Sequence, residues 1–263
     1  MKLLYIHSKD KRVQKVNKLI EEHFPKILTE KHPDLILVSG GDGAMLHAIQ
    51  SFSHLDKPFL GHAMGTFNFL MNTISLDQLK DTIDRIQEDT ISFNKISTSK
   101  IKVQICTNNS KSNKNIGDAV NEVVIGSSIM GYHTFVLNSK DNTFTNFTVK
   151  GSGLCVSTDL GSTGYNFNLG RDILPLGSNL WLLSGIVCDR YLKDIMQIEE
   201  LQITCSCDRF EPTIFLDGID KKVNLKKGDK VILKKGGDIN LYFLNKNSFL
   251  SKRLDIISRY RRI

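Results

Sequence analysis

Leu35-Ile-Leu-Val-Ser-Gly-Gly-Asp-Gly43 is the stretch that decides the fold. Its first four residues form a short apolar run of the kind that buried strands of a parallel sheet have. The run ends in a glycine-rich turn with one acid, after which Met45, Leu46 and Ile49 follow at helical spacing. A strand, a glycine turn and a helix in this order are typical of an open α/β sheet, which binds ligands at the carboxyl ends of its strands.

The glycine turn has the chemistry of a phosphate site. Gly41 and Gly43 would let the backbone approach a phosphate closely, and the following helix offers free N–H groups and the positive end of its dipole. Asp42 adds a carboxylate there, which makes sense if it holds Mg²⁺ or accepts a proton from an attacking hydroxyl. A plain glycine turn in which Asp42 caps the helix is the alternative that this stretch leaves open.

Residues 1–95 are predicted to form one α/β domain with a parallel sheet. Apolar runs at Leu3–Ile6 and Pro58–Gly61 are candidate neighbouring strands, and amphipathic patterns follow the first run and span Leu76–Ile86. Strands that alternate with helices in this way imply right-handed crossovers in a parallel sheet.

Residues 96–245 are predicted to form an all-β sandwich, because short strand-like runs recur there between polar turns. Thr107–Asn115 is predicted to be one of these turns. The strand-like runs are Val103–Cys106, Glu122–Ile125, His133–Leu137, Phe144–Val149, Leu154–Ser157, Trp181–Leu183, Leu201–Cys207, Thr213–Leu216, Lys230–Leu233 and Asn240–Leu244.

Residues 246–263 are predicted to form a basic helix that returns to the N-terminal domain. The net charge of the whole chain is +7, which favours anionic partners. Because over half of that charge lies in the final residues, outside the candidate motifs, we expect neither nucleic acid nor a membrane as a partner.

Several classes of protein are excluded by the composition and the motifs. Five scattered cysteines do not make a disulfide scaffold. The N-terminal apolar run is too short for a secretory signal, and no run approaches the ~18 residues of a membrane span, so a cytoplasmic location is expected. The chain has no Walker P-loop, GxGxxG, HExxH or GxSxG motif, and no spacing that predicts a metal site built from side chains alone.

Three further segments follow the glycine turn: Gly61–Leu70, a glycine-punctuated loop; Asp118–Val124, which contains Asn121-Glu122; and Gly151–Asn166, which ends in a Gly-Ser-Thr-Gly-Tyr turn. In order and spacing the four segments resemble the NAD kinase family, whose pattern is GGDG, G-x-N-x-G-x-L-G-F-L, NE and GDGL-x-(V/I)-STP-x-GSTAY. A later Asp217-Gly218 resembles the DG element of that family. The resemblance covers roughly residues 35–235, and the combination is more specific than GGDG, which lipid kinases share.

The resemblance implies a NAD kinase that transfers a phosphoryl group from ATP or polyphosphate to the 2′-hydroxyl of the adenosine ribose of NAD. It implies Asp42 as the catalytic residue, Mg²⁺ bound mainly through phosphates, and a homodimer or homotetramer. It also implies binding roles for Gly41, Gly43, Phe69, Asn121, Glu122, Ser152, Asp159, Thr163, Gly164, Tyr165, Asp217 and Gly218.

The chain departs from the family pattern at several positions. Ser152 replaces the aspartate of GDG, Ala44 replaces a threonine and Ala63 an asparagine, while Gly164 replaces the alanine of GSTAY. Asp159, in place of a proline, is a candidate to supply the carboxylate that position 152 lacks. A nucleotide-binding relative without turnover, and more remotely a lipid kinase, are therefore the alternatives.

Overall fold

The computed structural model describes residues 1–65, 68–107, 112–127, 131–170, 172–197, 199–206 and 211–245. The described chain divides into two compact units, one of which combines Met1–Ser97 with the described residues from Ile239 on, while the other is Thr98–Asp238. The chain leaves the first unit within β4 (Asn94–Cys106) and re-enters it within β14 (Lys230–Phe243). The predicted helix over 246–263 lies outside the described residues.

The first unit contains a parallel sheet. Its strands are β1 (Leu3–His7), β2 (Leu35–Gly40) and β3 (Phe59–Ala63), in that order, and the far end of β14 pairs in parallel with β3. All six residues of β2 are buried, as the apolar run at its start predicted. The parallel sheet expected from the alternating pattern is therefore confirmed.

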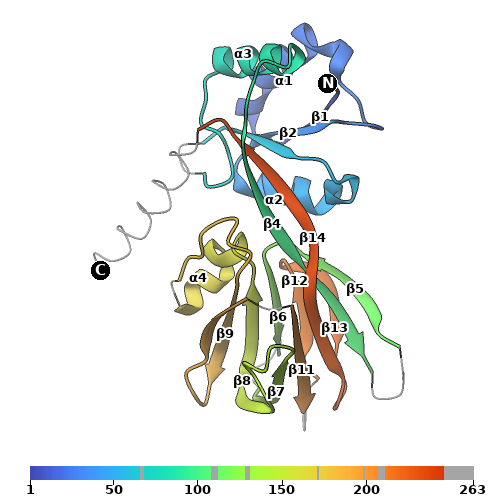
Figure 1. Cartoon of the computed structure of the whole chain (residues 1–263), viewed down its shortest axis with the longest axis vertical. Coiled ribbons are helices and arrows are strands. Elements are labelled where there is room, and N and C mark those ends of the chain that lie inside the picture. Colours follow the sequence, from blue (N-terminus) through green and yellow to red (C-terminus); the bar gives the residue numbers. More distant parts are fainter. Residues whose placement is uncertain are drawn as a thin grey trace, which may run out of the picture. The chain divides into compact units, whose positions relative to one another are not determined.

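Helices cover both faces of this sheet. Figure 1 shows α1 (Gln14–His23) and α3 (Leu76–Gln87) on one side and α2 (Asp42–Phe52) on the other. Leu35 and Leu37 of β2 pack with α1 and α3 in one apolar cluster, so the alternating residues between them face α2. Short 3₁₀ turns are Lys11–Val13, Pro25–Ile27 and Ser53–Leu55.

The second unit is mainly an antiparallel β structure. β11, β7, β8, β6, β12 and β13 follow one another, β9 and β10 lie on the other edge of β8, and β5 pairs with β4. Its elements are β5 (Lys114–Ala119), β6 (Glu122–Gly126), β7 (His133–Ser139), β8 (Phe147–Ser157), the 3₁₀ turn Gly161–Thr163, α4 (Tyr165–Gly170), β9 (Trp181–Cys188), β10 (Lys193–Met196), β11 (Glu200–Ser206), β12 (Thr213–Leu216) and β13 (Ile219–Asn224). The predicted fold class, α/β followed by a β-rich domain, is confirmed, with the short helix α4 as an addition.

β8 corrects one part of the strand prediction. The runs Phe144–Val149 and Leu154–Ser157 were expected to be separate strands, but Phe147–Ser157 is one continuous strand. The glycines between the runs serve close packing of strands rather than a turn. A Cβ on Gly153 would lie 2.7 Å from the carbonyl oxygen of Ile125, which only a glycine avoids.

Two smaller features also differ from the expected pattern. The runs Lys230–Leu233 and Asn240–Leu244 were expected to be separate strands, but Lys230–Phe243 is one continuous strand, β14. The predicted turn Thr107–Asn115 is shorter at its end, because Lys114 and Asn115 already belong to β5, and its residues 108–111 lie outside the description. None of the helices within the described ranges combines the length and apolar character that a membrane span requires.

Candidate functional site

The glycine turn joins the end of β2 to the start of α2. Gly41 is the residue before the helix, and Asp42 and Gly43 are its first two residues. A Cβ on Gly40 would lie 2.7 Å from Ala44 Cβ, so the fold itself requires that glycine. A Cβ on Gly43 would meet nothing within 4 Å. Gly43 therefore borders open space at the helix N-terminus, where a phosphate can be bound.

The Asp42 carboxylate holds the second predicted loop. Its Oδ1 and Oδ2 accept the backbone N–H of Phe69 at 3.0 and 2.8 Å, and Oδ1 also accepts the N–H of Leu70 at 2.9 Å. The residue before α2 is Gly41, and Asp42 is the first residue of the helix and not its N-cap. The structure thus brings the Asp42 carboxylate and the Phe69 backbone together.

Asn72 was not identified from the sequence, yet it fixes the same loop. Its Nδ2 donates to the carbonyl oxygens of Gly61 at 3.0 Å and Tyr242 at 3.1 Å, and its Oδ1 accepts the N–H of Leu244 at 2.8 Å. A single asparagine therefore ties the loop after β3 to the last strand. Nothing in the sequence shows that residues about 170 positions apart meet there, so this role could not have been found.

Asp217 holds the Asn121-Glu122 turn of the second unit. Its Oδ1 accepts the N–H groups of Asn121 at 2.7 Å and Glu122 at 3.0 Å, and its Oδ2 accepts that of Val120 at 2.8 Å. Asp217 and Gly218 have φ values of +51° and +68° and join β12 to β13, so they also have the left-handed backbone of a tight hairpin turn. These three hydrogen bonds join the Asp217 carboxylate to the backbone of residues 120–122.

Glu122 is a buried acid with an unusual environment. Its side chain is 9% exposed and accepts the backbone N–H of Tyr165. Within the described part of the chain, its Oε2 is buried and has no hydrogen-bond partner. Burial, and secondly the charge of Asp217, raise the pKa of Glu122 to about 7, against a smaller opposing effect of the Tyr165 N–H.

The turn after β8 packs directly on Asn121. Thr158 donates its hydroxyl to the carbonyl oxygen of Val120 at 2.7 Å and its N–H to that of Asn121 at 2.8 Å. Its Oγ1 also accepts the N–H of Gly161 at 3.0 Å. A Cβ on Gly161 would lie 2.1 Å from the Asn121 carbonyl oxygen. Thr158 and Gly161 were not singled out from the sequence, although the Ser-Thr and Gly-Ser-Thr positions of the family pattern mark them.

Thr163 is the last residue of the 3₁₀ turn, Gly164 follows it, and Tyr165 is the first residue of α4. Tyr165 is 44% exposed, so one part of its ring is open to a ligand. Burial of the remainder raises the pKa of its hydroxyl. Asn166, which follows, is buried, and both polar atoms of its amide have no hydrogen-bond partner in the described residues. Buried amides without partners are rare, so a polar ligand or water is expected beside it.

Ser152 and Asp159 lie apart from each other. Ser152 is in the middle of β8, about 16 Å along the strand from Ser157, which pairs with Glu122. Asp159 is buried beyond the end of the strand, where its carboxylate bonds the Thr98 hydroxyl and, at 3.1 Å, the N–H of Asn179. These contacts support the fold of the turn and give no indication that Asp159 takes the place of a carboxylate at 152.

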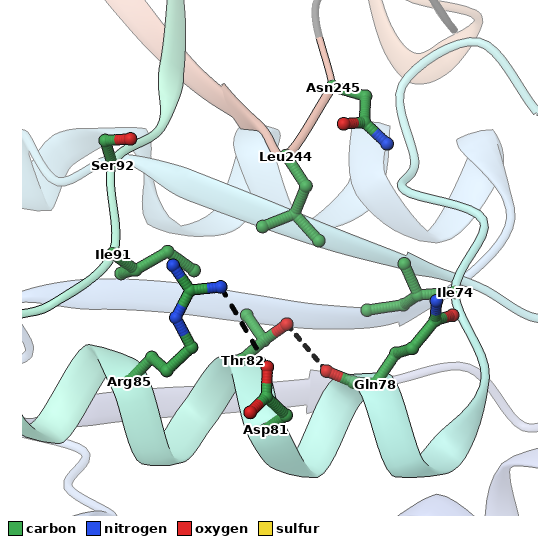
Figure 2. Close-up of a pocket in the computed structure, with 9 residues that line it drawn as sticks. All are labelled: Ile74, Gln78, Asp81, Thr82, Arg85, Ile91, Ser92, Leu244 and Asn245. Atoms are coloured by element: carbon green, nitrogen blue, oxygen red, sulfur yellow. Dashed lines mark hydrogen bonds and ion pairs between the residues drawn. The ribbon is translucent and has the colours of Figure 1, made fainter.

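A separate cavity of about 330 Å³ lies beside α3 in the first unit. Figure 2 shows its lining, in which Arg85 points to Asp81 and the Thr82 hydroxyl bonds the Gln78 carbonyl oxygen at 2.7 Å. None of the predicted site residues lines it. We therefore do not include this cavity in the candidate site.

Sequence comparison connects the chain to proteins of known activity. Residues 5–91 match the family model of the ATP-NAD kinase N-terminal domain. The chain is 33% identical over 164 residues to a NAD kinase of Rickettsia bellii, covering 58% of this chain and 56% of that relative. It is 30% identical over 192 residues to a NAD kinase of Rickettsia canadensis, covering 72% and 70% respectively. The match thus spans just over half of the Rickettsia bellii protein and more than two thirds of the other.

Comparison with solved structures supports the fold. The yeast NADH kinase crystallised with NADH superposes with a TM-score of 0.79 at 16% identity, over 98% of this chain and 88% of that one. A NAD kinase from Archaeoglobus fulgidus in complex with ATP superposes with a TM-score of 0.72 at 17% identity, over 96% and 98%. At this level of identity the likeness concerns the fold.

Proposed function

This chain belongs to the NAD kinase family, and we propose that it transfers a phosphoryl group from ATP or polyphosphate to the 2′-hydroxyl of the adenosine ribose of NAD. The observation that carries the proposal is the pairing of Asp42 with the backbone of Phe69 and Leu70. It places the acid of the glycine turn at a helix N-terminus next to the loop that the family pattern predicts. An acid beside an anion site fits a reaction in which a hydroxyl loses a proton to a carboxylate.

In the proposed reaction the 2′-oxygen of the ribose forms a bond to the terminal phosphorus, while the bond between that phosphorus and the leaving phosphate oxygen breaks. The hydroxyl proton passes to Asp42, and the leaving group departs as ADP or as shortened polyphosphate. Gly41 and Gly43 take the phosphates through the backbone at the start of α2. Such transfer needs mostly positioning and neutralisation of charge.

Mg²⁺ is expected to arrive on the phosphates of the donor, where it would neutralise charge. In the described part of the chain, no group of three or more His, Cys, Asp or Glu side chains is placed to hold a metal ion. Mg²⁺ commonly binds with few protein ligands and keeps waters and substrate phosphates in its shell. The residues present therefore fit a metal carried by the substrate better than one held in a protein cage.

In the second unit, Asn121, Glu122 and Tyr165 are proposed to bind the nucleotide. Glu122 and Asn121 each have a buried side-chain oxygen without a partner among the described residues, and Tyr165 has an exposed ring. Unsatisfied buried polar atoms and an open aromatic face together suit a ligand with both a ring and hydrogen-bonding edges. A homodimer or homotetramer in the cytoplasm remains part of the proposal.

The test is to incubate the purified full chain with NAD, Mg²⁺ and either ATP or polyphosphate and to measure NADP. NADP formation with one donor supports the proposal and identifies that donor. Binding of NAD by calorimetry without any NADP would instead identify a nucleotide-binding relative without turnover. Phosphorylation of diacylglycerol in the absence of NADP formation would identify a lipid kinase.

A further inference from the structure

Glu122 is surrounded by groups that disfavour its ionised form. It is nine-tenths buried, and the only charge that acts on its carboxyl group among the described residues is the negative charge of Asp217. Cys155, on β8, also interacts with it electrostatically, but burial raises the pKa of that thiol and keeps it neutral. Tyr165 supplies one N–H, a weaker influence that favours the ionised form.

Asp217 cannot move away from this position easily. Its carboxylate is bonded to three consecutive N–H groups, those of Val120, Asn121 and Glu122, and its own N–H donates to the Glu122 carbonyl oxygen at 3.0 Å. These four bonds fix the backbone of the turn relative to the Asp217 charge. They also give each oxygen of the Asp217 carboxylate at least one hydrogen-bond donor. Glu122, in contrast, has a buried carboxyl oxygen without a partner among the described residues, and burial together with the charge of Asp217 raises its pKa.

The protonated Glu122 has a hydrogen that no described protein group accepts. One carboxyl oxygen takes the Tyr165 N–H, whereas Oε2 is buried without a partner. Gly164 packs closely on this oxygen, because a Cβ there would lie only 3.1 Å from Oε2. A buried O–H group without an acceptor costs free energy, and a ligand atom that accepts it recovers that cost. The complementary atom is an acceptor, such as a ring nitrogen or a sugar oxygen.

We propose that Asp217 is a positioning residue that keeps Glu122 protonated, so that Glu122 donates a hydrogen bond from Oε2 to an acceptor atom of the bound nucleotide. This inference rests on the proposed function only in naming NAD as the nucleotide. On this inference Asp217, in the Asp217-Gly218 element, affects ligand binding indirectly, by way of Glu122. It also predicts that the affinity for the nucleotide depends on pH.

The experiment measures the affinity for NAD by calorimetry between pH 5.5 and 8.5 with no phosphoryl donor present. If only protonated Glu122 binds, Kd rises about tenfold from pH 6 to pH 8, and binding at pH 8 takes up a proton, which two buffers of different ionisation enthalpy reveal. Glu122→Gln, whose amide donates at every pH, should bind with a Kd that stays flat. Asp217→Asn should move the midpoint of the wild-type profile to lower pH, because it removes the negative charge next to Glu122.

The matched control is Asp238→Asn, which removes an exposed carboxylate of the same unit and should leave the profile unchanged. A wild-type profile that is flat, or a Glu122→Gln profile that keeps the wild-type midpoint, overturns the donor role. A midpoint that Asp217→Asn leaves in place overturns the role of Asp217, whereas a merely structural role would change Kd equally at every pH.

A readout without nucleotide separates this inference from the proposed function. The carbon-13 shift of the Glu122 carboxyl, assigned by its disappearance in Glu122→Gln, is expected to titrate near neutral pH in the wild type and at lower pH in Asp217→Asn. Titration at the ordinary pH of a glutamate would overturn the inference even if the protein makes NADP. If NAD does not bind at any pH, the donor role fails, and the carboxyl titration still decides the effect of Asp217.

Discussion

The backbone N–H of Leu70 lies 2.9 Å from Oδ1 of Asp42, although the two residues are 28 positions apart in the chain. Asp217 and Asn121 form the same kind of bond at 2.7 Å across 96 positions. In each unit an Asp-Gly pair uses its carboxylate to hold the backbone of another candidate motif. Asp42 and Asp217 therefore contribute to the shape of the site as well as to its charge. Their substitution should accordingly affect both stability and activity.

Asp42→Asn is expected to lower kcat for NADP formation by about 100-fold to 10,000-fold, which is the usual contribution of a general base to the rate. The amide retains one oxygen that can accept the Leu70 N–H, so the loop should keep its place, and the free energy of unfolding should fall by only about 1 kcal/mol. NAD binding should persist. Steady-state kinetics, calorimetry and urea unfolding of the same preparation measure the three quantities.

The control for Asp42→Asn is Asp81→Asn on α3, which removes a carboxylate that is 68% exposed. It should change neither kcat nor stability appreciably, because exposed ion pairs contribute little. Unchanged turnover in Asp42→Asn would remove Asp42 from the mechanism. Loss of NAD binding together with a large loss of stability would show that its main role is to hold the loop.

Gly43→Ala is expected to separate folding from phosphate binding. The new Cβ meets no protein atom within 4 Å, and alanine is a better helix former than glycine, so stability should stay the same or rise by up to about 1 kcal/mol. The same methyl group would occupy space that the phosphates need, so KM for the phosphoryl donor should rise. Thermal unfolding and initial rates at varied donor concentration measure both effects.

Gly61→Ala provides the contrast to Gly43→Ala. A Cβ on Gly61 would lie 2.6 Å from Met71 Sδ and 2.9 Å from the Leu70 carbonyl oxygen, so this variant should lose stability. If Gly43→Ala kept the wild-type KM for the donor at wild-type stability, the phosphates would not bind at the start of α2.

The α/β part of the fold could be predicted from the sequence because its signals are local. β2 is a short apolar run, and α3 is an amphipathic helix whose expected span, Leu76–Ile86, differs from the observed one by a single residue. In the β-rich part the glycines of β8 were misleading. A glycine such as Gly153 is typical of a turn. Here it is required because a neighbouring strand approaches closely, and the local sequence does not show which strands become neighbours.

The candidate site was predictable as a set of motifs but not as a network of contacts. The sequence pointed to Asp42, Glu122 and Asp217 by their resemblance to a family pattern. That Asp217 bonds the backbone before Glu122, or that Asn72 ties β3 to β14, depends on residues that meet only in the folded chain. The raised pKa of Glu122 likewise follows from burial and from the neighbouring charge, and neither can be obtained from spacing.

Asp159→Asn is expected to weaken the fold and leave the affinity for NAD unchanged. Asp159 is 1% exposed and its two carboxylate oxygens bond the Thr98 hydroxyl and the Asn179 N–H, so one of these partners will face an amide NH₂ group instead. A buried donor left without an acceptor costs about 1–3 kcal/mol. Urea unfolding gives the stability and calorimetry the affinity. Weaker NAD binding at wild-type stability would show instead that Asp159 does replace the carboxylate missing at Ser152.

Glu122→Gln is expected to change how stability depends on pH. The pKa of Glu122 is raised from 4.5 to about 7 in the folded chain, so the folded state binds more protons than the unfolded state between those values. The stability that this proton contributes is complete below pH 4.5 and is lost as the pH rises through 7. A shift of this size corresponds to at most about 3 kcal/mol. The glutamine variant carries no such proton and loses nothing over this range.

Urea unfolding of wild type and Glu122→Gln at pH 5, 6, 7 and 8 measures the effect, with Glu30→Gln as the control because Glu30 is exposed. The stability of Glu122→Gln relative to wild type should increase from pH 5 to pH 7 and level off towards pH 8, whereas that of Glu30→Gln should stay constant. A difference between Glu122→Gln and wild type that does not vary with pH would mean that Glu122 is ionised in the folded chain throughout. Its buried and unpartnered Oε2 would then accept a hydrogen bond from the nucleotide, from a donor such as a ribose hydroxyl.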